Sequence, residues 1–405
     1  MGKRNFAWTD VALGTVVSLV VLLTFYMGWA DVLEHKFYDM RAKLRAQAKA
    51  GDKVVLIGID DQSIREIGRW PWPRNYLAEM TDQLAEAGAK VIGIDVFFSD
   101  KEINPGLDQI KIIQQAFAEK LEEAKVEEAK LLRDAKVQSP QSRLAAEFLN
   151  TLDQSAKQLD NDARLGDSIA LAGNVVLPMY FELGVAPGKI NKPIPDYVAK
   201  NFIANVNSDG TATPSVNFTA PYGAFGKESA AVGQSNLTPS PDGVQRAVPL
   251  VVDFNGKLMP SFALQAIRSY YSLASDDYRY TPGKELVLGR AHIPVDAEGR
   301  FLVDYLNRQT IPRYYFSDVR NKKVPPEAFR DKIVLIGMMA TGGGDTYISP
   351  IADLYPGVEI HANVINNILA GKYLVRPEWA QKLEFGLMIL FALFVALAIP
   401  HLSAG

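Results

Sequence analysis

The 405-residue sequence contains no cysteine and only four histidines. The missing cysteines exclude disulfides, thiolate zinc sites and iron–sulfur clusters, and the few scattered histidines offer no histidine-rich metal motif. The net charge of −3 offers no basic surface to nucleic acid, so we predict no nucleic-acid partner. A nucleophile elbow, an HExxH motif and a Walker motif are also missing. We therefore predict no catalytic activity in residues 1–405.

Long apolar runs are confined to the two ends of the chain, at residues 11–30 and 383–401. Each run has the length of a helix that spans a bilayer. Lys3 and Arg4 precede the first run, which places the N-terminus in the cytoplasm by the positive-inside rule. The sequence thus predicts a protein of the cell inner membrane with lipid contacts at both ends. A large loop would lie on the periplasmic or extracellular side.

Two observations keep alternatives open at the ends. Residues 28–30 form a small-x-small triplet after a basic start, which is also typical of a cleaved signal peptide. Lys372, Arg376 and Lys382 flank the second run on the predicted outer side, which argues against the orientation that Lys3 and Arg4 predict. We predict an anchor at 1–30, a helical stalk at 31–51, a sensor domain at 52–382 and a second membrane helix at 383–405.

The large loop begins with the pattern of an α/β protein. Residues 53–61 and 90–98 are apolar runs typical of strands buried on both faces, and a helical stripe at 76–84 separates them. A strand–helix–strand unit of this length predicts a parallel sheet. Residues 174–181 and 332–337 predict further strands, the latter nearly repeating residues 53–58.

Two other regions depart from this parallel pattern. Residues 101–165 carry two apolar stripes separated by Ser139-Pro140, which predicts a helical hairpin that packs on itself, a second subunit or a partner. Residues 184–330 are richer in turn signals such as Asp242-Gly243 and Asn255-Gly256. The whole sequence therefore predicts a mostly parallel sheet with flanking helices, an antiparallel β-rich extension, a helical-hairpin insertion and one transmembrane helix at each end.

Several motifs resemble a known family. They are residues 59–63 (IDDQS), 68–74 (GRWPWPR), 93–98 (GIDVFF), 242–246 (DGVQR) and 356–363 (PGVEIHAN). Together they resemble the CHASE-type extracellular sensory domain of the second class, found in bacterial adenylate cyclases, diguanylate cyclases and kinases. The resemblance covers residues 31–374. It implies a sensor module without chemistry of its own, whose output domain, if the chain is a fragment, is a cyclase or a kinase.

Acidic residues follow the predicted parallel strands. Asp60 and Asp61 end the first strand, Asp95 ends the second, and Asp345 follows the glycine-rich loop after the last. Because the carboxyl ends of parallel strands share one edge, we expect these residues to form one rim, with Arg74 as counter-ion. One interpretation is a site for a small cationic ligand or a divalent cation. The other is a set of caps and salt bridges that fix the loops.

The remaining candidate residues are aromatic. Trp70 and Trp72 alternate with Pro71 and Pro73, which predicts either a stiff aromatic wall for a ligand or a loop packed over the sheet edge. The glycine-rich loop at 342–344 has no Walker lysine, and Asp345 would repel phosphate, which argues against a phosphate site.

The sequence thus predicts a sensor input domain, acting as a homodimer on a small-molecule or protein stimulus that the sequence does not identify. Two alternatives remain: a structural scaffold that assembles through its helical insertion, and an anchored periplasmic hydrolase that uses the carboxylates.

Overall fold

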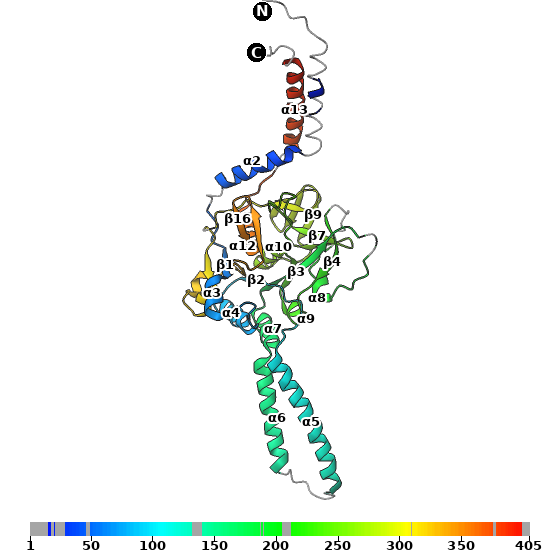
Figure 1. The fold of residues 1–405 in the computed structure, drawn as a ribbon, viewed down its shortest axis with the longest axis vertical. Helices are drawn as coiled ribbons and strands as arrows, with labels where there is room; N and C mark the ends of the chain where they lie inside the picture. The colour runs from blue at the N-terminus through cyan, green and yellow to red at the C-terminus, as the bar shows by residue number, and fades with distance from the viewer. Residues whose placement is uncertain are drawn as a thin grey trace, which may run out of the picture.

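The computed structural model describes residues 15–17, 20, 29–45, 49–131, 140–186, 188, 190–204, 212–308, 310–375 and 378–398. Three parts follow each other along its longest axis (Figure 1). Helices α2 (Trp29–Arg45) and α13 (Glu378–Ala398) lie at one end, and the hairpin of α5 (Pro105–Leu131) and α6 (Pro140–Leu159) lies at the other. A body built around a sheet occupies the middle, so the two helical extensions leave it in opposite directions.

A nine-stranded sheet forms the centre of the body, in the order β13-β1-β14-β2-β3-β4-β7-β8, with β5 also paired to β3. Its parallel core consists of β1 (Val54–Ile59), β14 (Ile333–Met338) and β2 (Val91–Asp95), which are almost wholly buried as their apolar runs predict. The near-identical segments 53–58 and 332–337 lie side by side on β1 and β14 in register, with Val54 opposite Ile333. The prediction that they share one sheet is confirmed.

The parallel half joins an antiparallel extension at β3 (Val175–Leu183). This strand pairs parallel with β2 and antiparallel with β4 (Thr213–Thr219). The remaining strands of the sheet are β5 (Ala231–Gln234), β7 (Val251–Phe254), β8 (Lys257–Pro260) and β13 (Arg313–Tyr315). Smaller sheets are formed by β9 (Tyr278–Thr281), β10 (Glu285–Leu288) and β11 (Ala291–Pro294), by β6 (Ala247–Pro249) and β12 (Arg300–Leu302), and by β15 (Thr346–Ser349) and β16 (Ala352–Pro356).

Helices cover both faces of the sheet because alternate strand residues point to opposite sides. Leu56 packs in one core with Val358 of α12 (Gly357–Ala370) and Phe262 of α10 (Phe262–Tyr270). Ile57, the next residue, packs in a second core on the other face. That second face is covered by α3 (Asp61–Ile67), α4 (Asn75–Glu86), α7 (Asn161–Ala172), α9 (Gly223–Glu228) and α11 (Phe316–Arg320). The short helices α8 (Asp196–Ala199) and η1 (Pro326–Ala328) complete the described helices.

The helical-hairpin insertion is present, but it ends earlier than its apolar stripe predicted. The rings of Phe117 and Phe148 pack edge to face between α5 and α6, with centroids 5.0 Å apart. The helix breaks at Asp160, whose side chain accepts a hydrogen bond from the Ala163 backbone N–H and caps α7. Residues 161–172 therefore belong to the body. The predicted break at residue 139 lies outside the described residues.

The prediction of one transmembrane helix at each end is wrong: within the described ranges, no helix combines the length and the apolar character needed to cross a membrane. Most of the run at 11–30 lies outside the described residues. The second run falls on α13, whose sequence carries Glu378, Lys382 and Glu384 in its first two turns. These charges shorten its apolar part below the roughly 20 residues that a span requires.

Candidate functional site

The structure brings together two of the predicted rim carboxylates, Asp95 at the end of β2 and Asp345 after the glycine-rich loop. Burial, and then the nearby Asp345 charge, raise the pKa of Asp95 to about 8. Burial also raises the pKa of Asp345, while a hydrogen bond from Tyr347 opposes that shift. Asp345 packs so closely on Gly357, the first residue of α12, that a Cβ there would lie 2.5 Å from its Oδ2. The rim therefore holds a half-buried acid pair against the start of α12.

Asp60 and Asp61 fix local structure at the same edge. Asp60 Oδ1 accepts a hydrogen bond from the Ser63 backbone N–H at 2.6 Å and caps α3. Asp61 Oδ2 accepts hydrogen bonds from the backbone N–H and the hydroxyl of Thr341, at 3.2 and 2.9 Å. Asp60 is thus a helix cap, and Asp61 holds the start of the glycine-rich loop at Thr341. Their role in ligand binding stays a prediction.

Arg74 pairs with a carboxylate outside the rim and is not the counter-ion of the rim residues. Its guanidinium forms an ion pair with Asp162 at the start of α7 and donates to the backbone carbonyl of Asp100. It also lies over the rings of Phe98 and Phe225, at 5.3 and 5.1 Å from their centroids. Arg74 precedes α4, and α4 packs on α7, which places the arginine at the root of the helical hairpin.

Trp70 and Trp72 pack a loop onto the body. Trp72 is 6% exposed, its indole N–H donates to the Gly68 carbonyl at 2.7 Å, and its ring lies 4.9 Å from that of Phe316. Trp70 contacts Trp72 edge to face at 5.1 Å. This arrangement is that of the packed-loop interpretation, with Trp72 inside the core that contains α4.

The rim gathers few metal ligands. Among the residues that the structure describes, no group of three or more Asp, Glu, His or Cys side chains is placed to hold a metal ion. The divalent cation of the sequence analysis stays a prediction, and Asp95 and Asp345 are its two nearest candidate ligands.

A second cluster holds α2 against the body, and we call Arg246, Asp39 and Asp242 the stalk clamp. The Arg246 guanidinium donates to both carboxylate oxygens of Asp39 on α2, at 2.8 and 2.7 Å. It also donates to both oxygens of Asp242, each at 2.8 Å. The Arg246 side chain is only 6% exposed, and its hydrogen bonds lower the pKa of Asp242. One buried cation thus joins two carboxylates, one from the stalk and one from the body.

Next to the stalk clamp lies a cavity of about 570 Å³ between α2 and the body, which we call the stalk pocket. Burial, and then the charges of Asp304 and Asp39, raise the pKa of Tyr38 in its wall to about 12. Arg45 forms an ion pair with Asp304 at 3.2 Å across the same interface. Leu374 and Val375, after α12, line the pocket too. The segments that precede and follow the body in the sequence therefore meet there.

Buried polar contacts connect this interface to α12. The backbone N–H of Asp304 donates to Asn367 Oδ1 at 2.9 Å, and Asn367 Nδ2 donates back to the Asp304 carbonyl at 3.0 Å. Asn363 is held in the same way, since its Oδ1 accepts from the Leu306 N–H at 2.8 Å. A chain of contacts thus runs from Arg45 on α2 through residue 304 into α12.

The start of α12 is anchored by a buried acid. Glu359 is 2% exposed and pairs with Arg308 at 3.2 Å and with Arg313 at 3.0 Å. Asn363 Nδ2 donates to the hydroxyl of Tyr355 at 2.8 Å. Sequence reasoning gave residues 242–246 and 356–363 no individual roles. The available signal was a glutamate, a histidine and three asparagines in an otherwise apolar helix, where all five side chains are buried.

Comparison with known proteins gives one match. The family model of the CHASE2 domain matches residues 16–398. No curated protein and no solved structure matches the chain. The match spans the sheet, the acid pair, the stalk clamp and the helical hairpin, and CHASE2 is a sensory domain of signalling proteins. The chain belongs to the CHASE2 domain family.

Proposed function

We propose that this chain is the sensory input module of a signalling protein and passes a stimulus to a cyclase or kinase output by shifting α2 and residues 371–375 on the body. We call residues 371–375, between α12 and α13, the exit segment. The observation that carries the proposal is the stalk clamp, because it joins α2 to the body through polar links that can open. The compartment of the body stays a prediction.

The geometry of the stalk clamp suits a two-state device. If α2 moves away, Arg246 keeps both hydrogen bonds to Asp242 and is not left as an unpaired buried charge. Stranding a buried charge is the main cost of breaking such a pair. A retained partner therefore keeps the docked and undocked states close in free energy. A stimulus shifts the equilibrium between two states only if it binds one of them more tightly than the other. When the two states are close in free energy, a small difference in affinity is enough.

Spin labels can test this movement directly. The chain has no native cysteine, so cysteines placed at exposed Lys43 on α2 and Lys257 on β8 would be the only attachment sites. Pulsed dipolar spectroscopy on the whole chain should show a displaced or broadened distance distribution in Arg246→Ala. Arg320→Ala removes an ion pair with Glu79 elsewhere on the body and should leave the distribution unchanged.

The relay to an output needs a second measurement. A diguanylate cyclase catalytic domain fused after Gly405 reports on the exit segment through its rate of product formation. Arg246→Ala should change that rate at least threefold, whereas Arg320→Ala should not. Unchanged rates and unchanged distances in Arg246→Ala would contradict the proposal.

The helical hairpin favours assembly as a second role. Ile112 and Leu144 are 58% and 70% exposed, and Ile113 and Phe148 are 46% and 43% exposed. Apolar side chains exposed together on a projecting element mark interaction surfaces. We propose that the hairpin contacts a second copy of the chain. Light scattering should give a dimer mass that falls to a monomer mass in Ile112→Lys/Leu144→Lys, and a monomer mass for the unaltered chain would exclude this role.

A further inference from the structure

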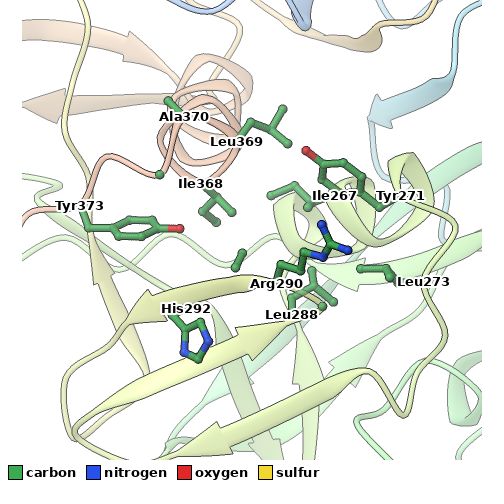
Figure 2. Close-up of a pocket in the computed structure, with 13 residues that line it drawn as sticks. Ile267, Tyr271, Leu273, Leu288, Arg290, His292, Ile368, Leu369, Ala370 and Tyr373 are labelled. Carbon is green, nitrogen blue, oxygen red and sulfur yellow. The ribbon is translucent and has the colours of Figure 1, made fainter.

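A separate cavity of about 800 Å³ lies on the body beside the exit segment (Figure 2). Its walls come from the end of α10, the turn between β10 and β11, the end of α12 and the exit segment itself. We call it the exit pocket. Its volume lies in the range of pockets that enclose small organic ligands, roughly 300 to 1,000 Å³.

The floor of the exit pocket is apolar. Ile267 and Leu288 are each 2% exposed and Ile368 is 4% exposed, and all three belong to the core on this face of the sheet. Leu273 and Leu369 extend this surface. The floor therefore offers a ligand a hydrophobic contact that is already rigid, because it is continuous with the packed core.

Few polar side chains face the exit pocket, and they are hydrogen-bond donors. Figure 2 shows the Tyr373 hydroxyl directed toward Ile368, and the Arg290 guanidinium directed toward Ile267 and Tyr271. No described residue supplies a hydrogen-bond or ion-pair partner for the exposed Arg290 guanidinium. The lining includes no Asp or Glu, and the carboxylate of Glu285 on β10 is bonded to His292 Nδ1 at 2.9 Å.

The end of α12 adds its carbonyl groups to one wall, and these oppose an anion. Two of them are already occupied: the Gly371 N–H donates to the Ile368 carbonyl at 3.1 Å, and the Lys372 N–H donates to the Asn367 carbonyl at 3.0 Å. The remaining electrostatic preference comes from Arg290, whose planar guanidinium suits bidentate binding of a carboxylate.

We propose that the exit pocket binds a small amphipathic carboxylate, with its apolar part on Ile267, Leu288 and Ile368 and its carboxylate on Arg290. Tyr373 would lie against the bound molecule, and its neighbours Leu374 and Val375 line the stalk pocket. Occupancy would therefore act on the exit segment that adjoins α2. The inference names a ligand class for the proposed sensor and rests on that proposed function only for this last step.

The probe is decanoate below its micellar concentration, compared with decanol and decylammonium, which carry the same tail without the anionic group. Isothermal titration on the whole chain should show decanoate binding at least tenfold more tightly than either. Arg290→Ala should weaken decanoate binding at least tenfold and leave decanol binding unchanged. Ala370→Phe should abolish binding of both, because it fills the pocket from an exposed position at the end of α12.

Arg279→Ala is the matched control, since Arg279 is an exposed arginine of the same small sheet outside the pocket lining. It should bind decanoate like the unaltered chain. Equal binding of the three probes, or decanoate binding that survives Arg290→Ala, would overturn the inference. Decanoate binding that changes neither the spin-label distances between positions 43 and 257 nor the rate of the fused cyclase would support the ligand site and overturn its link to signalling. A fused cyclase that responds to Arg246→Ala in a chain that binds no decanoate would support the proposed function and overturn the ligand site.

Discussion

Each end of the body has an arginine of low exposure at the base of its helical extension, and the two arginines differ in their partners. At the hairpin root, Arg74 has one carboxylate partner, Asp162, together with a backbone carbonyl and two aromatic rings. At the stalk, Arg246 has two carboxylate partners, Asp39 from α2 and Asp242 from its own loop. Their side chains are 12% and 6% exposed.

This difference separates a fixed attachment from a movable one. Opening the hairpin root would leave the largely buried Arg74 without a carboxylate partner, which is unfavourable. Opening the stalk leaves Arg246 paired with Asp242, so that only part of its stabilisation is lost. The contacts at the hairpin end therefore favour permanent attachment. Those at the stalk end allow α2 to leave the body and return.

The largest effect is expected at the hairpin root. Arg74→Ala should lower the free energy of unfolding by about 3 kcal/mol, because it leaves Asp162 unpaired and removes the contacts with Phe98 and Phe225. Urea denaturation of the whole chain measures this change. Arg74→Ala and Asp162→Asn should be non-additive, whereas Arg74→Ala and Asp95→Asn should add, because Arg74 and Asp95 occupy separate sites. Additivity of the first pair would refute the assignment.

At the stalk, the two partners of Arg246 predict unequal effects. Arg246→Ala should cost about 2 kcal/mol because it leaves two carboxylates facing each other. Asp39→Asn should cost about 1 kcal/mol, since Asp242 keeps the arginine paired. Thermal unfolding measures both. Equal losses in the two variants would mean that Asp242 does not hold Arg246 when Asp39 is lost, and the contrast between the two ends would fail.

The sheet between the two ends should show its own pH dependence. Asp95 keeps its proton in the folded protein up to a pKa of about 8 but loses it near 3.8 when unfolded, so stability falls as pH rises through this window. Burial lowers the pKa of His361 from 6.5 to about 4, so this group makes stability rise with pH between these values. It therefore opposes the effect of Asp95 only below pH 6.5. Arginine stays charged throughout and contributes no slope.

Asp95→Asn should therefore stabilise the protein at pH 8 by more than about 1 kcal/mol relative to its effect at pH 4. Urea midpoints at the two pH values, measured side by side, give this difference. Asp276→Asn, at an exposed loop carboxylate, is the control and should leave the profile unchanged. A stability of the unaltered chain that rises between pH 6.5 and 8 would be incompatible with a protonated Asp95.

The smallest effect is expected at the outer part of the hairpin. Replacing residues 112–152 with a short glycine linker should change the unfolding free energy of the body by less than about 0.5 kcal/mol. In the described residues, α5 and α6 pack mainly on each other, so the body loses few contacts. Calorimetry of both chains measures the difference. A large loss of stability would show that the hairpin, rather than Arg74 at its root, stabilises that end.

Local patterns were sufficient for the elements but not for the partners of polar residues. The apolar runs placed β1, β2, β3 and β14 to within about three residues, because a strand buried on both faces requires such a run. The rim prediction for Asp95 and Asp345 followed from the shared edge of parallel strands. Arg74 was assigned wrongly because its partner Asp162 is 88 positions away, beyond a long insertion.

The stalk clamp illustrates the same limit. Asp242 and Arg246 are four positions apart and formed a recognisable motif, but Asp39 is 207 positions from Arg246. A side chain's distant partner depends on how helices and loops dock, and burial decides whether its charge needs that partner. The exit pocket was missed for this reason too, since its walls come from three separate segments of the chain.

The sequence by itself determined the parallel strands, the hairpin and the resemblance to a sensory family, because periodicity and short motifs are local properties. Only the tertiary structure decided which arginine pairs with which carboxylate, that Trp72 packs inside a core, and that the exit segment passes beside two pockets. These features depend on contacts between residues far apart in the chain. Such contacts form when apolar surfaces pack, and buried polar groups then bond to whichever partners the packing has brought within reach.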